Sequence, residues 1–278
     1  MKCELKDITV HYEAIGEGIP IIMLHGWSLS HRQMLNVMEP LFAQRDGWKR
    51  IYPDLPGHGR TPAREWITNQ DKILDVVLDF IDKVIPGQRF VVAGASAGAY
   101  LARGVVLRRA AMLDGVLLTV PMIVAPDAER RVPAHICIVK DPALVAELPP
   151  DEAQEFNDLA VVQTRKMVEA LRAFSAANEI GDQVFQAGIR EDPGRYAFSF
   201  DVDAIPEPCA APTLIVAGRQ DSMVGYVQAL EIMENYPRAT LAVLDRAGHC
   251  LEFEQEEVFG VLVREWLDRV EEYTAAGK

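Results

Sequence analysis

Short runs of β-branched and other apolar residues alternate with longer, helix-periodic segments along most of the chain. Several of these runs are apolar at every position, as in strands that are covered on both faces. The predicted strands cover residues 8–14, 20–24, 50–52, 90–95, 115–118, 213–217 and 240–244. This alternation predicts the α/β class, with a mostly parallel central sheet covered by helices on both faces.

Helical periodicity is clearest in three segments of this α/β part. They cover residues 71–84, 99–109 and 258–270. In the first segment, apolar side chains recur at a spacing of three and four residues, and Pro86 and Gly87 follow its end. We therefore expect helices that pack against the predicted sheet.

One long segment, residues 121–208, breaks the alternation. It contains no convincing pair of buried strands, but helical patterns cover residues 152–177 and 180–189, and prolines cluster at both edges. We predict a helical insertion that lies over the end of the sheet. Residues 1–120 and 209–278 would then form the core domain. A long decorated connection is the alternative interpretation.

Composition and charge narrow the range of partners. The chain has 278 residues, of which 49% are hydrophobic and 25% charged, as in an ordinary folded protein. Its net charge of -13 makes nucleic acids and anionic membrane surfaces poor partners and leaves small molecules or proteins. Residues 121–208 hold 16 acids and 8 bases, and residues 251–278 hold 8 acids and 3 bases. An acidic insertion would disfavour polyanionic substrates such as acyl-CoA.

The sequence favours a cytoplasmic protein. The first residues are polar and acidic where a secretory signal needs an apolar run, and the most apolar stretch, residues 116–126, is too short to span a bilayer. The cysteines are scattered without a C-x-x-C pair, which argues against a zinc site or a disulfide framework. They are Cys3, Cys137, Cys209 and Cys250. The oligomeric state does not follow from the sequence.

A strand-turn-helix segment carries the first candidate for chemistry. The predicted strand at residues 90–95 runs into Gly94-Ala95-Ser96-Ala97-Gly98, and a helical pattern follows. This is a G-x-S-x-G motif, in which small residues permit a tight turn that lifts the serine above the sheet. The start of the helix adds free N–H groups and the positive end of a dipole. A capping serine in a glycine-rich turn is the structural alternative.

Two later strands supply partners for this serine. Asp221 follows the strand at residues 213–217, and His249 follows the strand at residues 240–244. Side chains at the carboxyl ends of parallel strands meet at one edge of the sheet. A serine hydroxyl becomes a strong nucleophile when a histidine can take its proton and a carboxylate orients that histidine. We predict that Ser96, Asp221 and His249 converge as a catalytic group.

The chain order Ser, Asp, His resembles that of the α/β-hydrolase superfamily. The segment His25-Gly26-Trp27 is similar to the family's oxyanion-hole motif, and residues 54–61 are similar to its D-x-x-G-x-G-x-S/T turn. The resemblance covers nearly the whole chain outside the insertion. It implies an α/β-hydrolase fold with a helical cap inserted after the sixth strand.

The resemblance also implies roles for individual residues. Ser96 would be the nucleophile, His249 the general base and later acid, and Asp221 the carboxylate that orients the imidazole. The backbone N–H groups of Trp27 and Ala97 would hold the oxyanion. Candidates for the lining of a substrate pocket under the cap are Met122, Ile123, Met167 and Phe174. Packing in the core explains these apolar residues about as well.

Other candidates favour structural roles. His25 and His58 do not follow a late strand as the base of a triad does, and Asp54 belongs to the turn motif. Cys250 is better explained as a small packing residue than as a second nucleophile. The remaining histidines are His11, His31 and His135. They have no companions in the sequence that suggest a metal site, so neither a metal nor a cofactor is expected.

A serine at the elbow favours an acyl-enzyme route on a small carbonyl substrate. Family members that displace halide or open epoxides use aspartate there, so we expect a carboxylesterase-like serine hydrolase of esters, lactones or thioesters. Carbon–carbon bond hydrolases and their menaquinone-pathway relatives are the nearest alternative. They usually have a second glycine after the elbow and a tryptophan after the histidine, where this chain has Ala99 and Cys250. A hydrolase-like ligand-binding protein with little turnover is the alternative from another class.

Overall fold

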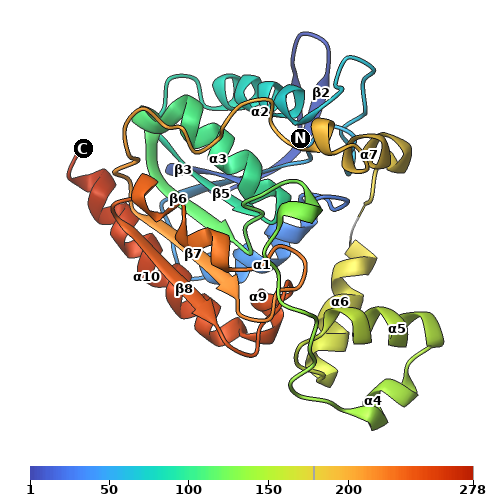
Figure 1. Cartoon of the computed structure of the whole chain (residues 1–278). Helices are drawn as coiled ribbons and strands as arrows, with labels where there is room; N and C mark the ends of the chain where they lie inside the picture. The colour runs from blue at the N-terminus through green and yellow to red at the C-terminus, as the bar shows by residue number, and fades with distance from the viewer. Residues whose placement is uncertain (178, 278) are drawn as a thin grey trace.

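The computed structural model describes residues 1–177 and 179–277 and is built on an eight-stranded sheet (Figure 1). The strand order is β1-β2-β4-β3-β5-β6-β7-β8. The β1–β2 and β2–β4 pairs are antiparallel, and each pair from β4 to β8 is parallel. The predicted mostly parallel α/β architecture is confirmed.

All seven predicted strands overlap a strand of this sheet. The strands are β1 (Lys2–Glu4), β2 (Thr9–Ile15), β3 (Ile19–Leu24), β4 (Trp48–Pro53), β5 (Phe90–Ala95), β6 (Leu113–Thr119), β7 (Thr213–Gly218) and β8 (Ala239–Leu244). The edge strand β1 was not predicted, because it is three residues long and buries a single side chain, that of Cys3. The insertion begins after β6, the sixth strand of the chain.

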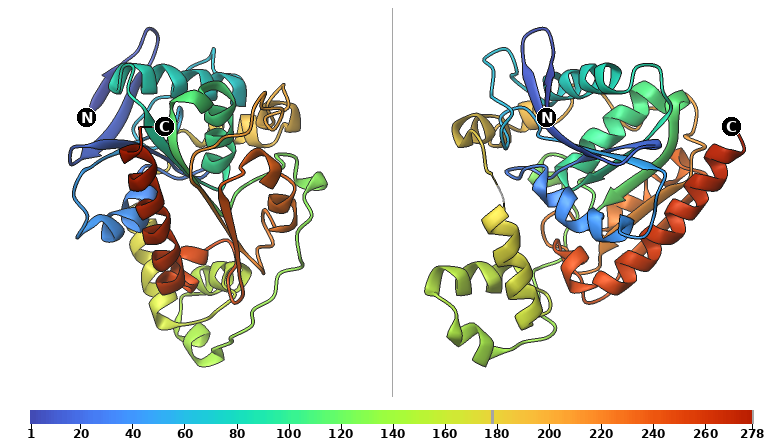
Figure 2. Two further views of the ribbon diagram at one scale, coloured as in Figure 1. Left: turned by 90° about the vertical axis from the view of Figure 1, so that its left-hand side faces the viewer. Right: turned by 180° about the vertical axis from the view of Figure 1, so that it is seen from behind.

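Helices cover both faces of the sheet (Figure 2). The four long helices of this layer are α1 (Arg32–Phe42), α2 (Gln70–Val84), α3 (Ala97–Arg109) and α10 (Glu256–Ala275). Side chains of α2 and α3 join one core cluster, and side chains of α1 and α10 join the cluster on the opposite face. The three predicted helices lie within α2, α3 and α10, whereas α1 was not predicted.

Helix α3 differs from the others because its first ten residues are all buried. It lies between the sheet and α2, so it has no solvent-facing stripe over most of its length. Small residues make this position possible. A Cβ atom on Gly104, for example, would lie 2.8 Å from a methyl carbon of Leu74.

The segment between β6 and β7 is helical, and we call residues 121–208 the insertion. Its helices are α4 (Pro142–Glu147), α5 (Pro150–Leu159), α6 (Arg165–Ala177), α7 (Gln183–Arg190) and α8 (Pro193–Tyr196). Helices α4 to α6 form a lobe beside α9 (Leu251–Glu254), and α7 packs on the turn at Gly57 (Figure 1). Short 3-10 turns cover Ala110–Met112, Asp127–Glu129, Val227–Leu230 and Met233–Asn235.

The single helix predicted over residues 152–177 is wrong in one respect, because the structure divides it. Helix α5 ends at Leu159 and α6 begins at Arg165. Between them, Val162 forms a parallel bridge with Val139, and Gln163 donates its backbone N–H to the Val139 carbonyl. Two β-branched residues in sequence favour this extended pairing over a helical turn.

Among the helices in the described part of the chain, none is both long and apolar enough to cross a membrane. The thiols of Cys3, Cys137, Cys209 and Cys250 are free.

Candidate active site

The strained turn between β5 and α3 presents Ser96. Its φ is 55°, in the left-handed region that non-glycine residues rarely adopt. A Cβ atom on Gly98 would lie 2.2 Å from the Leu24 carbonyl oxygen, and one on Gly94 would lie 2.3 Å from the Gly98 carbonyl oxygen. Both outer glycines of the motif are therefore required. At Gly98 the start of α3 presses against the end of β3, and at Gly94 it presses against β5 itself.

Ser96, His249 and Asp221 form a continuous hydrogen-bonded relay. The His249 Nε2 atom lies 3.0 Å from Ser96 Oγ, and its Nδ1 atom lies 2.9 Å from Asp221 Oδ2. His249 follows β8 and Asp221 follows β7, so the carboxyl ends of three parallel strands supply the group. The structure brings together the three side chains that the sequence singled out.

The surroundings of the relay favour a charged Asp221 beside His249. Burial alone would raise the pKa of Asp221, but His249 and the backbone N–H groups of Met223 and Val224 lower it. Burial alone would lower the pKa of His249, but the Asp221 carboxylate raises it above its ordinary value. Asp221 is fully buried, whereas Ser96 and His249 are partly exposed.

The loop after β3 lies directly against the serine. A Cβ atom on Gly26 would lie 3.5 Å from Ser96 Cβ, and the Gly26 N–H donates to Gln33 Oε1 at 2.6 Å. The N–H groups of Trp27 and Ala97, the two predicted oxyanion donors, have no acceptor among the described residues. They therefore have the capacity to donate to a bound oxygen atom.

His25 and His58 are buried beside this loop and have structural partners. The Leu55 N–H donates to His25 Nε2 at 3.0 Å, so the His25 Nδ1–H donates to the Gly26 carbonyl at 2.7 Å. The Nδ1 atom of His58 lies 2.9 Å from the Pro56 carbonyl oxygen, and its ring packs edge-on against Trp27. Burial lowers the pKa of His25 to about 4 and that of His58 to about 3, so both rings are neutral at pH 7.

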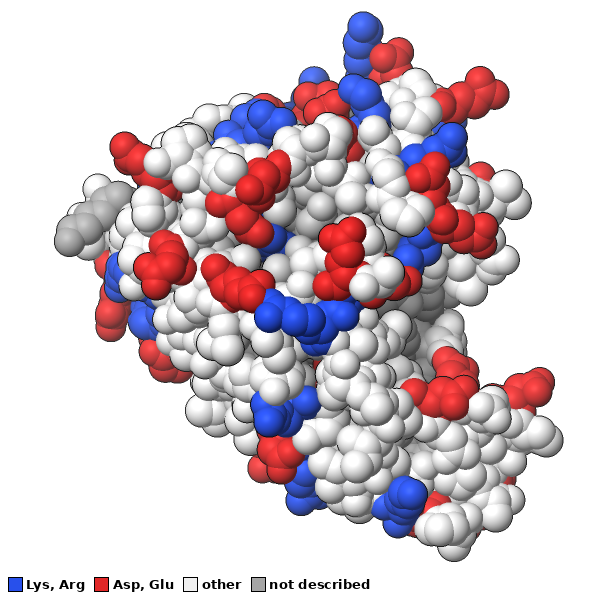
Figure 3. All heavy atoms as spheres, viewed as in Figure 1, with Lys and Arg blue, Asp and Glu red and all other residues white. Residues whose placement is uncertain are grey.

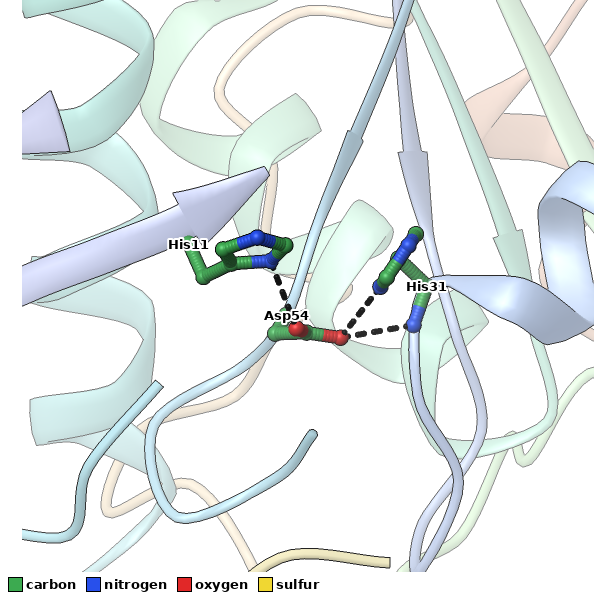
Figure 4. Close-up of side chains that lie close together, drawn as sticks. All are labelled: His11, His31 and Asp54. Carbon is green, nitrogen blue, oxygen red and sulfur yellow. Dashed lines mark hydrogen bonds and ion pairs between the residues drawn. The ribbon is translucent and has the colours of Figure 1, made fainter. Parts of the chain in front are cut away.

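Asp54 joins three distant segments next to the same loop (Figure 4). One carboxylate oxygen accepts hydrogen bonds from the backbone N–H and Nδ1 of His31, both at 2.8 Å. The other accepts from the backbone N–H of Arg60 at 3.0 Å and lies 3.1 Å from Nδ1 of His11. Although burial raises the pKa of Asp54, these donors lower it well below its ordinary value.

This His11, His31 and Asp54 cluster was missed in the sequence, because its members lie on β2, before α1 and after β4. One ligand atom from each residue lies within 4.8 Å of the others, a spacing that metal sites share. Each Asp54 oxygen, however, already accepts a backbone N–H and faces an imidazole. The cluster is explained as the anchor of the turn at residues 54–61, in keeping with the turn role predicted for Asp54.

The four predicted pocket residues lie in two places. The Met122 N–H donates to the Ser96 carbonyl at 3.2 Å, and Met122 and Ile123 are buried in the core cluster that includes α3. Met167 is buried in the small core of the α4–α6 lobe, and Phe174 packs edge-on against Phe253 of α9. Their contact with a substrate stays a prediction.

Arg130 and Glu254 are two charged residues at the site that the sequence did not reveal. Arg130 is nearly buried and donates to the carbonyl oxygens of Val124 at 2.8 Å and Met223 at 3.1 Å. It therefore ties the segment after β6 to the loop that carries Asp221. Glu254 contacts the loop of His249. Neither residue belongs to a motif, so their partners follow only from the fold.

Comparison with known proteins identifies the family. The model of the alpha/beta hydrolase family matches residues 21–261, which is most of the chain. The chain belongs to the alpha/beta hydrolase family. The α/β-hydrolase superfamily that the motifs predicted is thereby confirmed, and the fold agrees with it.

Individual relatives of this alpha/beta hydrolase have different activities. A pimeloyl-[acyl-carrier protein] methyl ester esterase of Legionella pneumophila (strain Paris) is 22% identical, over 94% of this chain and 100% of that protein. A 2-hydroxy-6-oxononadienedioate/2-hydroxy-6-oxononatrienedioate hydrolase of Pseudomonas putida is also 22% identical, over 94% of this chain and 92% of that one. A solved alpha/beta superfamily hydrolase from Oenococcus oeni PSU-1 is 28% identical, with a TM-score of 0.84 over 95% of this chain and 97% of that one.

Proposed function

We propose that this alpha/beta hydrolase is a serine hydrolase of small carboxylic esters, lactones or thioesters. The observation that carries the proposal is the Ser96–His249–Asp221 relay, with separations of 3.0 and 2.9 Å, at a strained elbow. A nucleophile within hydrogen-bond reach of a base, and a base oriented by a carboxylate, is the arrangement needed for acyl transfer.

In the proposed reaction, His249 Nε2 takes the proton of Ser96 Oγ as that oxygen attacks the substrate carbonyl carbon. Asp221 accepts the Nδ1–H of His249 and stabilises the imidazolium that forms. His249 then gives its proton to the leaving alkoxide or thiolate, and the acyl group stays on Ser96. A water molecule, deprotonated by His249, attacks the acyl-enzyme and releases the acid.

The charge that develops on the carbonyl oxygen would be stabilised by the N–H groups of Trp27 and Ala97. Their lack of another acceptor in the described residues supports this role. The Ala97 N–H belongs to the first turn of α3, where helix N–H groups have no intrahelical partner. Each such donor contributes about 3 kcal/mol to the stabilisation of the transition state.

Carbon–carbon bond hydrolysis is the second candidate, because a dienedioate hydrolase is among the relatives. The esterase hypothesis is preferred for two reasons. Five of the relatives are methyl ester esterases, from three Legionella pneumophila strains, Aeromonas salmonicida and Vibrio campbellii, and the position after His249 holds Cys250. A cysteine there leaves less aromatic surface beside the histidine than a tryptophan would.

Substitution of the nucleophile tests the proposal. We expect Ser96→Ala to reduce the hydrolysis of short acyl p-nitrophenyl esters by about 10⁴-fold or more, as in other triads. The matched control is Ser175→Ala, since Ser175 is exposed on α6. A fluorophosphonate should label wild type on Ser96, as read by peptide mass, and should leave Ser96→Ala unlabelled.

The outcome separates the candidate functions. Equal ester turnover by wild type and Ser96→Ala would refute the mechanism. A wild-type protein that cleaves dienone-type substrates but no ester would favour carbon–carbon hydrolysis. One that binds these compounds without turning any of them over would favour the ligand-binding alternative.

A further inference from the structure

A partly buried carboxylate connects the insertion to the loop that carries His249. Glu254, the last residue of α9, accepts the Gly248 N–H on one oxygen at 2.6 Å. Its other oxygen accepts the Val161 N–H at 2.7 Å and the Val162 N–H at 3.3 Å. One side chain therefore satisfies donors from two segments that are more than 80 residues apart in the chain.

The segment on the insertion side is a fixed part of the fold, and we call residues 160–163 the insertion root. All four residues are buried. The Val161 carbonyl accepts the N–H groups of Ile138 and Val139, so the root also holds the chain as it enters the α4–α6 lobe. The root is thus the place where two passes of the insertion meet the body of the molecule.

Close packing gives a second, independent contact between the root and the histidine loop, residues 245–250. A Cβ atom on Gly248 would lie 2.8 Å from a methyl carbon of Val161. The residue that precedes His249 is therefore a glycine against which the insertion root packs directly. Any displacement of the root changes the surroundings of the histidine loop.

The chemistry of the contact requires a carboxylate. Three N–H groups face Glu254, and both oxygens of a carboxylate accept hydrogen bonds without offering a donor. A glutamine amide would keep one acceptor oxygen and turn an NH₂ group toward at least one of these N–H donors. Hydrogen bonds to a partly buried charged group are also stronger than those between neutral groups.

From these contacts we infer that Glu254 is a positioning residue that couples the insertion to His249. This inference rests on the proposed function, in which His249 is the base. The carboxylate holds the Gly248 N–H and the root N–H groups in one geometry. The insertion and the catalytic histidine would then move together, so that the His249–Ser96 separation depends on the position of the insertion.

Glu256 provides a matched control for this residue. It lies two positions further on and also connects the insertion to the body, through an ion pair with Lys166 of α6 at 2.5 Å. Both side chains of that pair are more than half exposed, and Glu256 makes no hydrogen bond to the histidine loop among the described residues. The same Glu→Gln change at the two positions separates coupling from a general loss of contact with the insertion.

The experiment measures amide hydrogen exchange and turnover in the full-length protein. In Glu254→Gln, we expect exchange at Val161, Val162 and Gly248 to become about tenfold faster or more. Turnover of the best ester should show a kcat about tenfold lower with KM little changed, because the base and not the pocket is displaced. Glu256→Gln should leave both measurements at the wild-type values.

Several results would overturn the inference. Faster exchange at only one of the two segments would show that Glu254 does not couple them, and equal effects of the two Glu→Gln variants would show a nonspecific contact. If Glu254→Gln does not fold, Glu254→Asp, whose side chain is one methylene shorter, takes its place. It should show faster exchange at both segments and a lower kcat, with smaller changes in each. If the wild-type protein turns over no ester, the proposed function fails while the exchange experiment still decides the coupling.

Discussion

At the scale of single residues, Glu252 is a buried acidic residue close in the sequence to His249. It lies three positions after His249, is 7% exposed, and its Oε2 atom has no hydrogen-bond partner among the described residues. Burial raises the pKa of Glu252 to about 7. A buried carboxyl group with an unpartnered oxygen favours its neutral form, so this residue carries less charge at pH 7 than the sequence suggests.

The raised pKa predicts a pH-dependent gain in stability from Glu252→Gln. The pKa in the folded state lies above the unfolded value of about 4.3. The stability that the protonated carboxyl group contributes is therefore fully present below about pH 4.3 and is lost as the pH rises through about 7. Urea unfolding at pH 8 should show the variant to be more stable by roughly 2–3 kcal/mol.

The difference in the free energy of unfolding between Glu252→Gln and wild type should narrow as the pH is lowered toward 5. The exposed residue Glu257 gives the control, and Glu257→Gln should change the free energy of unfolding by less than about 0.5 kcal/mol at either pH. A variant of Glu252 that is no more stable than wild type at pH 8 would show that the carboxyl group has partners in solution.

Residues in local motifs could be predicted from the sequence, and residues with distant partners could not. Ser96 lies in a five-residue motif, Gly94–Gly98, that spans the end of β5 and the start of α3. Asp221 and His249 each lie in the loop after a later strand. Glu254 and Arg130 have backbone atoms of remote segments as partners. No spacing along the chain encodes such contacts, since they exist only once the insertion has packed on the body.

At the scale of elements, the junction of β5 and α3 is held by backbone contacts. The Gly98 Cα faces the carbonyl oxygens of Leu24 and His25, and neither can move without displacing β3 or the loop after it. The strand was predictable as a continuous apolar run, and the helix as the apolar segment that follows the Gly94–Gly98 motif. The end of α5 was not predictable, because Val161 and Val162 pair with a segment that lies before α4.

We predict that Gly98→Ala destabilises the fold by about 2 kcal/mol or more, because overpacking against backbone atoms cannot be relieved by a rotamer change. Gly188 is the matched control. It lies within α7, and a Cβ atom there meets nothing within 4 Å. Gly188→Ala should therefore stabilise the protein by about 0.5–1 kcal/mol. Urea unfolding of the two variants measures both changes.

At the scale of the whole molecule, the charge of -13 lies mainly on the insertion and the last helix. Figure 3 shows acidic side chains across the visible face, including the α4–α6 lobe. A hollow between α5 and the loop after Asp221 is lined by Asp151, Gln154, Glu155, Asp158, Leu159 and Met223. A polyanionic substrate that approaches along this side would be repelled.

Charge reversal on α5 tests this expectation. The triple variant Asp151→Lys, Glu155→Lys and Asp158→Lys should raise kcat/KM for a short acyl-CoA by about tenfold at low salt. Salt at about 0.5 M should remove most of this gain, because it screens the charges. The N-acetylcysteamine thioester of the same acid lacks the phosphates and should not respond. Lysine at Glu257, Glu265 and Glu272 of α10 changes the net charge equally and should have little effect. A similar response to both triple changes would argue against a local field.

The order of the relay along the chain has a consequence for biosynthesis. Ser96 directly follows the fifth strand, whereas Asp221 and His249 follow the last two strands, after the whole insertion. Domains generally fold as units, and the predicted core domain is complete only once its last strands have been translated. The histidine that the proposed mechanism assigns to Ser96 as its base is therefore translated 153 residues after it. Under the proposed mechanism, a nascent chain has Ser96 without its base, and turnover requires the loop that follows the final strand of the sheet.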